Sequence, residues 1–161
     1  DAEAHQRLRS LADDAEKHGQ VLLRRHDIPE SGYFVGPTIV AAEPSSPLAR
    51  EEVFGPVLAV LRARDLDHAF ALANDTDYAL TAGVMTRSPG TISRATTGLR
   101  GGNVYVNRAI TGSVVGRQPF GGYGLSGVGA KAGGPEYLLQ FMDPRVVTEN
   151  TLRQGFAPDT A

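Results

Sequence analysis

The sequence predicts an α/β fold in which strands pair mostly in parallel and helices flank a twisted sheet. Short apolar runs alternate with amphipathic segments, the connections between them are short, and residues 57–61 form a near-continuous apolar run. A strand inside a parallel sheet is buried on both faces, so its sequence is apolar almost throughout. The 161 residues suffice for about one domain, and the hydrophobic share of 41% suffices for a core.

The first half of the chain is expected to open with an amphipathic helix over residues 1–18, because Ala4, Leu8 and Leu11 recur on one face. Gly19 suits the end of this helix. We then expect a strand, an extended segment, a proline-rich loop and a strand buried on both faces, at residues 20–23, 32–40, 43–47 and 57–61.

Two helices in the second half carry capping signals. Asp65 can cap a helix over residues 66–73, and Ser88 can cap a second one that starts at Pro89 and ends near Gly98. The remaining elements are expected to be strands at residues 80–85 and 103–106, a helix after Pro135, a last strand at residues 146–148 and a mobile tail from Arg153.

The composition excludes several classes of function. The net charge of −2 and the scattered Lys and Arg residues argue against a nucleic-acid partner or an anionic membrane surface. No apolar run approaches the roughly 18 residues of a membrane span, and the charged first residues contain no secretory signal. The absence of cysteine removes disulfides, thiolate metal sites and thiol nucleophiles, and it fits a cytoplasmic protein. The four histidines lack metal-ligand spacing, so we expect no metal site.

One motif in the glycine-rich region imitates a nucleotide-binding signature. Residues 122–127, GYGLSG, match G-x-G-x-x-G, which binds a dinucleotide only between a strand and a helix. Pro119 lies where a central strand would be needed, and residues 128–134 cannot start a helix promptly. We therefore interpret this motif as an irregular glycine-rich loop.

The segment REEVFGPV, residues 50–57, places an acidic pair and an aromatic ring at the entry to a strand. The carboxylate of Glu52 could accept hydrogen bonds from a ribose diol, and the ring of Phe54 could lie against a flat heterocycle. In the alternative interpretation, Phe54 fills the core and Glu52 faces water. The residues alone favour the second interpretation.

With this segment the sequence resembles the aldehyde dehydrogenase superfamily over nearly its whole length. Its ordered motifs are REEVFGPV, ANDTDYALTAG, GNVYVN and QPFGG followed by LSG, at residues 50–57, 73–83, 102–107, 118–122 and 125–127. The resemblance implies that residues 1–144 are the C-terminal portion of the catalytic domain, without the Rossmann-like NAD domain. Residues 145–161 would then be an oligomerisation strand and a mobile tail, in a protein expected to be a homo-oligomer.

The segments NRAITGSVVGRQPF and KAGGPEYL, residues 107–120 and 131–138, resemble those of glutamate semialdehyde dehydrogenases, also called pyrroline-5-carboxylate dehydrogenases. This resemblance implies that Gly112 and Ser113 bind the α-carboxylate of L-glutamate γ-semialdehyde, and that Phe120 contacts its aliphatic part. A glycine turn with exposed amides forms an anion-binding concavity, which agrees with this role. A plain tight turn is the alternative.

The same resemblance assigns Glu52 to the hydroxyls of the nicotinamide ribose of NAD and Phe54 to the nicotinamide itself. We expect the segments around Phe54 and around Ser113 to converge as one wall of a shared crevice. In the family, a cysteine thiolate attacks the aldehyde, a hydride passes to NAD, and a glutamate activates the water that releases the acid.

Because this chain contains neither that cysteine nor the segment with the general-base glutamate, we assign it no catalytic residue and expect it to be inactive alone. We expect a truncated chain whose N-terminal part is missing, with a natural pseudoenzyme as the alternative. Two competing hypotheses are a piece of an aldehyde dehydrogenase with another substrate and a non-catalytic assembly module. The parent would act in proline catabolism, either alone or as half of a bifunctional proline-utilisation enzyme, and the sequence leaves NAD and NADP undistinguished.

Overall fold

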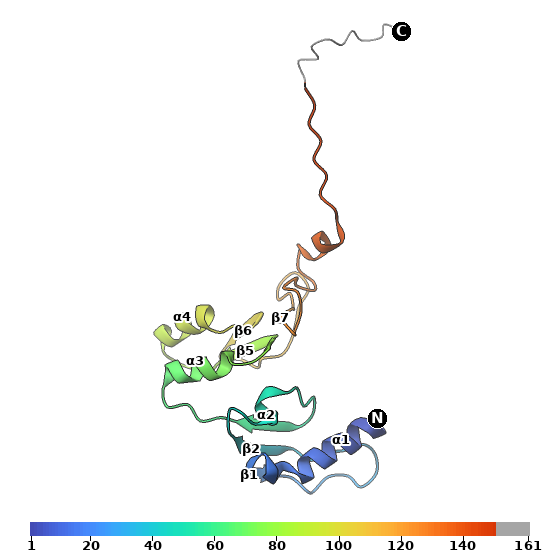
Figure 1. Ribbon diagram of the computed structural model, residues 1–161, viewed down its shortest axis with the longest axis vertical. Helices are drawn as coiled ribbons and strands as arrows, with labels where there is room; N and C mark the ends of the chain where they lie inside the picture. Colours follow the sequence, from blue (N-terminus) through green and yellow to red (C-terminus); the bar gives the residue numbers. More distant parts are fainter. Residues whose placement is uncertain (151–161) are drawn as a thin grey trace.

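The computed structural model describes residues 1–150, which form three small sheets with helices and loops around them (Figure 1). The expected α/β class is confirmed, because the chain contains both helices and strands, and α2, α3 and α4 each lie between strands along the sequence. The expected arrangement of one mostly parallel sheet is wrong for these residues. Strands pair in parallel at two places and antiparallel at two others, and the parallel pairs lie in different sheets.

The first sheet contains β1 (Gly19–Arg24), β2 (Thr38–Ala42) and β3 (Val57–Val60), in that order. β1 is antiparallel to β2 because residues 25–37 return the chain as a loop, without a crossover helix. β2 and β3 are parallel, and the crossover between them contains the short helix α2 (Pro47–Arg50). The antiparallel return of β1 is the part of this sheet that the apolar pattern did not indicate.

One face of this sheet is covered by α1 (Ala2–Asp13) and the 3-10 helix η1 (Ala15–Lys17), which together take the place of the longer expected helix. α1 begins at Asp1, whose side chain accepts a hydrogen bond from the Ala4 amide at 2.8 Å. The core under these helices combines buried side chains with half-buried neighbours: Ala15, Val40 and Leu48, with Leu11, Val21, Val53, Val57 and Ala59 around them.

The other face of the sheet is open, which corrects the prediction that β3 is buried on both faces. Burial alternates along β3, with Leu58 56% and Val60 37% exposed. The apolar run was interpreted as doubly buried because parallel strands normally have helices on both faces. The core between the helices and this sheet includes Val57 and Ala59 but not Leu58 and Val60, so every second side chain of β3 remains outside it.

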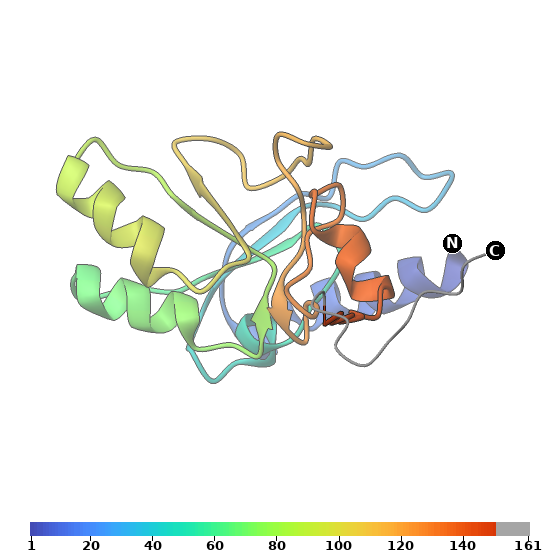
Figure 2. The ribbon, with the colours of Figure 1, turned by 90° about the horizontal axis from the view of Figure 1, so that it is seen from above.

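The second sheet is a β–α–β unit of β5 (Thr81–Val84), α4 (Pro89–Gly98) and β6 (Asn103–Val106). α3 (Leu66–Asn74) lies beside α4 at one end of the molecule (Figure 2). Arg94 of α4 pairs with Asp67 of α3, and its guanidinium lies 5.3 Å from the centre of the Phe70 ring. α3 and α4 are therefore linked by an ion pair and by a cation–π contact.

Both predicted helix caps are confirmed. The Asp65 side chain accepts a hydrogen bond from the His68 amide at 2.7 Å, and Ser88 Oγ accepts one from the Thr91 amide at 3.3 Å. These bonds satisfy amides that have no partner inside the first turn of a helix. The predicted strand at residues 103–106 is also confirmed, since it coincides with β6.

The third sheet is minimal and pairs β4 (Tyr78–Ala79) with β7 (Tyr123–Gly124) in antiparallel orientation. β7 lies inside the GYGLSG motif, and residues 125–134 contain no helix, so the interpretation as an irregular glycine-rich loop is confirmed. The helix expected after Pro135 is the short 3-10 helix η2 (Tyr137–Phe141).

The strand expected at residues 146–148 is absent from the described residues. Residues 142–150 contain no helix or strand and project away from the sheets (Figure 1), with Val146 88% exposed. A strand forms only where a second strand supplies hydrogen-bond partners, and no strand within residues 1–150 pairs with this segment. The tail that we expected to be mobile from Arg153, and residues 151–161 as a whole, lie outside the described residues.

Candidate functional site

The segment between α2 and β3 presents Phe54 in an unusual conformation. Its backbone φ is +50°, and its side chain is 83% exposed. A bulky residue at positive φ costs roughly 1–3 kcal/mol, and this ring recovers none of that cost by burial. Phe54 therefore does not fill the core formed by residues 1–150, whereas Glu52 is exposed as the alternative interpretation required.

Arg50 fixes the start of this segment against the end of α3. Its guanidinium donates hydrogen bonds to the Pro44 carbonyl at 2.8 Å, to the Asp75 carbonyl at 2.7 Å and to the Asp75 carboxylate at 2.6 Å. The bond from Arg50 lowers the pKa of the Asp75 carboxyl. The sequence did not indicate this hydrogen bonding, although Arg50 and Asp75 each lie in a motif that carried the family resemblance.

Glu52 lies at a cavity of about 430 Å³ between the segment that follows α2 and the glycine-rich loop. Its lining includes Glu52 from one side and Leu125 and Ser126 from the other. Ser126 Oγ accepts a hydrogen bond from the Ala79 amide at 3.0 Å, which holds this loop against the third sheet. The structure therefore brings Glu52 to the loop that contains the GYGLSG motif.

The residues expected to bind the substrate, Gly112, Ser113 and Phe120, lie outside the lining of this cavity. Gly112 and Ser113 are exposed. Gly112 has a φ of +103°, a backbone conformation that would be strained in a residue with a side chain. Val114 and Gln118 exchange two backbone hydrogen bonds, at 3.0 and 2.7 Å, so the chain between them forms a tight turn. Ser113 and Phe120 therefore lie near the two ends of one turn.

Phe120 is half-buried and is bridged to a neighbouring strand-like segment. Its amide and carbonyl bond to those of Ala132, at 3.0 and 2.8 Å. Asn103 at the start of β6 adds two bonds to the same stretch, to the Pro119 carbonyl at 2.9 Å and from the Gly121 amide at 3.2 Å. The two neighbours of Phe120 are thus hydrogen-bonded to β6 through Asn103.

The expected convergence of the Phe54 and Ser113 segments stays a prediction. Glu52 lines the 430 Å³ cavity, but Phe54, Gly112, Ser113 and Phe120 do not. Glu52 and the glycine-rich loop thus line one cavity. Ser113 and Phe120 lie on either side of one turn.

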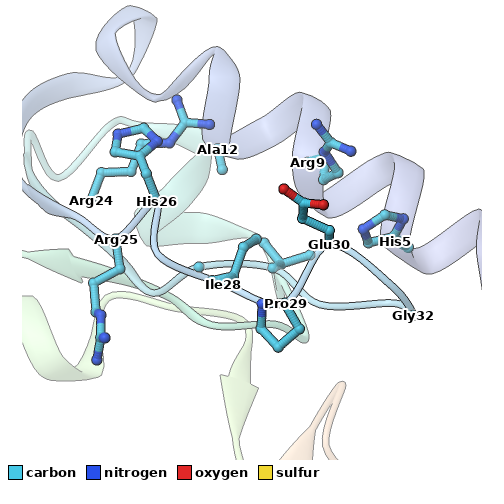
Figure 3. Close-up of a pocket in the computed structure, with 12 residues that line it drawn as sticks. His5, Arg9, Ala12, Arg24, Arg25, His26, Ile28, Pro29, Glu30 and Gly32 are labelled. Atoms are coloured by element: carbon cyan, nitrogen blue, oxygen red, sulfur yellow. The ribbon is translucent and has the colours of Figure 1, made fainter.

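A second cavity, of about 440 Å³, lies between α1 and the loop after β1 (Figure 3). Arg9 of α1 and Glu30 of the loop both line it, and so do Arg24 and Arg25. Arg24 is bonded to Asp13 and Arg25 to Asp27, so the positive charge of the lining is largely balanced. None of the residues expected to bind cofactor or substrate lines this cavity.

Lys131 holds the glycine-rich region together. Its ammonium donates hydrogen bonds to the carbonyls of Gly102, at 2.8 Å, and Gly121, and it lies 5.0 Å from the centre of the Tyr123 ring. Burial lowers the pKa of Lys131. Gly102 permits this packing, because a Cβ there would lie 2.0 Å from the Gly121 carbonyl oxygen.

Replacing Lys131 by methionine should lower the unfolding free energy by about 1–3 kcal/mol, because two partly buried carbonyls lose a charged donor. Lys17→Met is the matched control, since Lys17 forms an exposed pair with Asp14 at 2.7 Å. Such pairs contribute about 0–1 kcal/mol. Urea denaturation of the protein that contains this chain measures both variants, and equal losses would contradict the structural role of Lys131.

The sequence pattern of the aldehyde dehydrogenase family matches residues 1–147, and the chain belongs to this family. Within the family, its relatives at about 40% identity are 1-pyrroline-5-carboxylate dehydrogenases and the proline utilization A proteins (PutA).

Three similar proteins illustrate this relationship. The 1-pyrroline-5-carboxylate dehydrogenase of Geobacillus sp. (strain WCH70) is 38% identical over 150 residues, which are 92% of this chain and 29% of the relative. The structure of 1-pyrroline-5-carboxylate dehydrogenase from Thermus with bound NAD is 41% identical, with a TM-score of 0.84 over 89% of this chain and 28% of that one. PutA of Bdellovibrio bacteriovorus is 50% identical, with a TM-score of 0.88 over 99% of this chain and 17% of that one.

The chain therefore spans less than a third of the length of these relatives. Among the described residues, no helix combines the length and the apolar character that crossing a membrane requires.

Proposed function

We propose that this chain is the C-terminal portion of the catalytic domain of an NAD-dependent dehydrogenase that oxidises L-glutamate γ-semialdehyde to L-glutamate, in proline catabolism. Support comes from the relatives at about 40% identity, which are named 1-pyrroline-5-carboxylate dehydrogenases and PutA. Since the chain has no cysteine, the thiolate of the family reaction would come from polypeptide outside it. The role proposed for this chain is to orient the cofactor and the substrate.

The residues proposed to bind NAD fit its nicotinamide end. Glu52 offers exposed carboxylate oxygens, which can accept hydrogen bonds from the two ribose hydroxyls. Phe54 offers an exposed ring held at positive φ, and backbone strain of this kind is concentrated at functional sites. Bound NAD would accept the hydride, with Glu52 holding its nicotinamide ribose and Phe54 its nicotinamide ring. The Thermus relative has been solved with bound NAD.

The observation that carries the substrate assignment is the exposed stretch of Gly112 and Ser113, which immediately precedes the turn at residues 114–118 and which we name the Gly112 turn. Neither amide of this turn donates a hydrogen bond within residues 1–150, so both are available to an anion. The Ser113 hydroxyl adds a third donor, and Phe120 a half-buried apolar surface. These groups suit an aldehyde that carries a carboxylate at its far end.

We keep residues 145–161 as a proposed oligomerisation strand and tail. Val146 and Val147 are 88% and 82% exposed in the described part of that segment, and Figure 1 shows it projecting from the sheets. An apolar extended segment that gains a partner strand from a neighbouring subunit would account for its exposure.

The test compares two aldehydes that differ only in the carboxylate. The protein encoded by the complete reading frame is assayed for NADH formation with L-glutamate γ-semialdehyde and with 4-aminobutanal, which lacks the α-carboxylate. We expect kcat/KM to be at least about 100-fold higher for the first, because a site built for a polar group rejects a substrate without it. The chain alone, without cysteine, is the negative control.

Similar kcat/KM values for the two aldehydes would instead indicate an aldehyde dehydrogenase of another specificity. A folded full-length protein that oxidises neither aldehyde would indicate an assembly module.

A further inference from the structure

Tyr105 connects the rigid strand β6 to the exposed Gly112 turn. Its ring is 6% exposed, and its hydroxyl donates a hydrogen bond to the Gly112 carbonyl at 2.8 Å. β6 is itself paired along its length with β5, so the hydroxyl is fixed by a sheet. The turn therefore has one anchor point that does not depend on its own short-range bonds.

That hydrogen bond also sets the direction of the Ser113 amide. The Gly112 carbonyl and the Ser113 N–H belong to one planar trans peptide, in which the C=O and N–H bonds point in opposite directions. Because the carbonyl points to the buried Tyr105 of β6, the Ser113 N–H points away from β6. No acceptor within residues 1–150 takes this N–H, which leaves it available to a ligand.

Arg108 places a positive charge beside the same turn. Its guanidinium carbon lies 5.1 Å from the centre of the Tyr105 ring, a cation–π distance. Its Nη2 lies 3.5 Å from the Thr111 carbonyl oxygen and 3.7 Å from the position of a Cβ at Gly112. Arg108 forms no ion pair with a carboxylate among the described residues, so its charge is not neutralised there.

We propose that Tyr105 and Arg108 make the Gly112 turn selective for an aldehyde that bears a carboxylate. Tyr105 is a positioning residue, which turns the Ser113 amide outward. Arg108 is a specificity-determining residue, whose charge attracts the carboxylate to the exposed amides. This inference rests on the proposed function, and it adds two residues to the three that the family resemblance indicated.

The experiment uses the full-length protein and the same two aldehydes. Tyr105→Phe removes only the hydroxyl, and we expect the KM for L-glutamate γ-semialdehyde to rise about 3- to 10-fold, with kcat within about twofold. Arg108→Gln should raise the same KM by about tenfold, and Arg108→Lys should recover part of the loss because it restores the charge. The kinetics with 4-aminobutanal should not change in any variant.

Two variants control for general effects. Tyr33→Phe removes a hydroxyl from an exposed ring that contacts His5 near α1, and Arg87→Gln removes a charge from an exposed residue after β5. Both should leave the two KM values as they are. A salt titration adds a readout that a structural role would not move: the KM of the unmodified protein for the acidic aldehyde should rise with salt, and that of Arg108→Gln should not.

The outcomes separate the two proposals. A protein that does not prefer L-glutamate γ-semialdehyde to 4-aminobutanal overturns the proposed function and this inference with it. A protein that does prefer it, but keeps the same preference in Tyr105→Phe and Arg108→Gln, overturns only the inference. Equal losses for both aldehydes would likewise overturn the inference, because they would reflect a general disturbance of the fold.

Discussion

Replacing Phe54 by glycine should lower kcat/KM for NAD by about 10- to 100-fold without lowering the unfolding free energy. The exposed ring contributes no core packing, and its residue has a φ of +50°, which glycine adopts without strain. A substitution that usually costs stability should here leave stability unchanged or raise it slightly. The loss should appear only in the use of NAD, because the ring proposed to hold the nicotinamide is gone.

Glu52→Gln is the companion variant for the same site. It keeps the shape of the side chain but removes the charge, and a hydrogen bond to a charged group contributes about 1.5–3 kcal/mol. This corresponds to about a 10- to 100-fold loss in kcat/KM for NAD. Glu51→Gln is the matched control, since Glu51 is also exposed and lines the same cavity. Steady-state kinetics with varied NAD and a urea denaturation curve complete the comparison.

Three results would contradict the proposed NAD contacts. One is an unchanged kcat/KM for NAD in Glu52→Gln or Phe54→Gly. Another is an equal loss in Glu51→Gln. The third is a fall in unfolding free energy of several kcal/mol in Phe54→Gly, which would show that the ring is buried in the complete protein.

Ser113→Leu should raise the KM for L-glutamate γ-semialdehyde by about 10- to 100-fold while kcat stays nearly the same. The variant removes the hydroxyl and places an apolar side chain at the exposed amides that are proposed to bind the carboxylate. The far end of the substrate takes no part in the chemistry, so the loss should fall on binding. Kinetics with varied aldehyde at saturating NAD measure it.

Ser93→Leu is the control for this change, because Ser93 is an exposed serine of α4. It should leave the KM unaltered. If Ser113→Leu also left the KM unaltered, the turn would not be the carboxylate site. A fall in kcat with no change in KM would point to the reacting end of the substrate instead.

Elements defined by local bonds could be predicted from the sequence. Asp65 and Ser88 cap their helices because the bond joins residues three apart, and both capping residues are among those that supply it best. β6 was predicted from its short, mostly apolar run. Such features depend on a few consecutive residues, so their physics is visible in the sequence.

Features that depend on distant partners could not be predicted in the same way. The open face of β3 and the unpaired residues 146–148 depend on whether another layer or strand is present, and an apolar run is compatible with either case. The two carbonyls that bind Lys131 belong to residues 29 and 10 positions away along the chain. No periodicity indicates such contacts.

The residues of the candidate site also differ in whether the sequence could indicate them. Glu52, Phe54, Gly112, Ser113 and Phe120 came from motifs that resemble a family, and their exposure and backbone angles were then found in the structure. Tyr105 and Arg108 lie in two of these motifs, GNVYVN and NRAITGSVVGRQPF, but the resemblance assigned them no role. Their proposed roles follow from the hydrogen bond between the Tyr105 hydroxyl and the Gly112 carbonyl, and from the position of the Arg108 guanidinium beside the turn, both of which depend on the folded structure.

The most direct test is a crystal structure of the complete protein with NAD and L-glutamate, the proposed product. We expect an α-carboxylate oxygen within about 3.2 Å of the amide nitrogens of Gly112 and Ser113, with the nicotinamide against the Phe54 ring. A structure in which glutamate binds elsewhere and leaves the Gly112 turn in contact with solvent would contradict it.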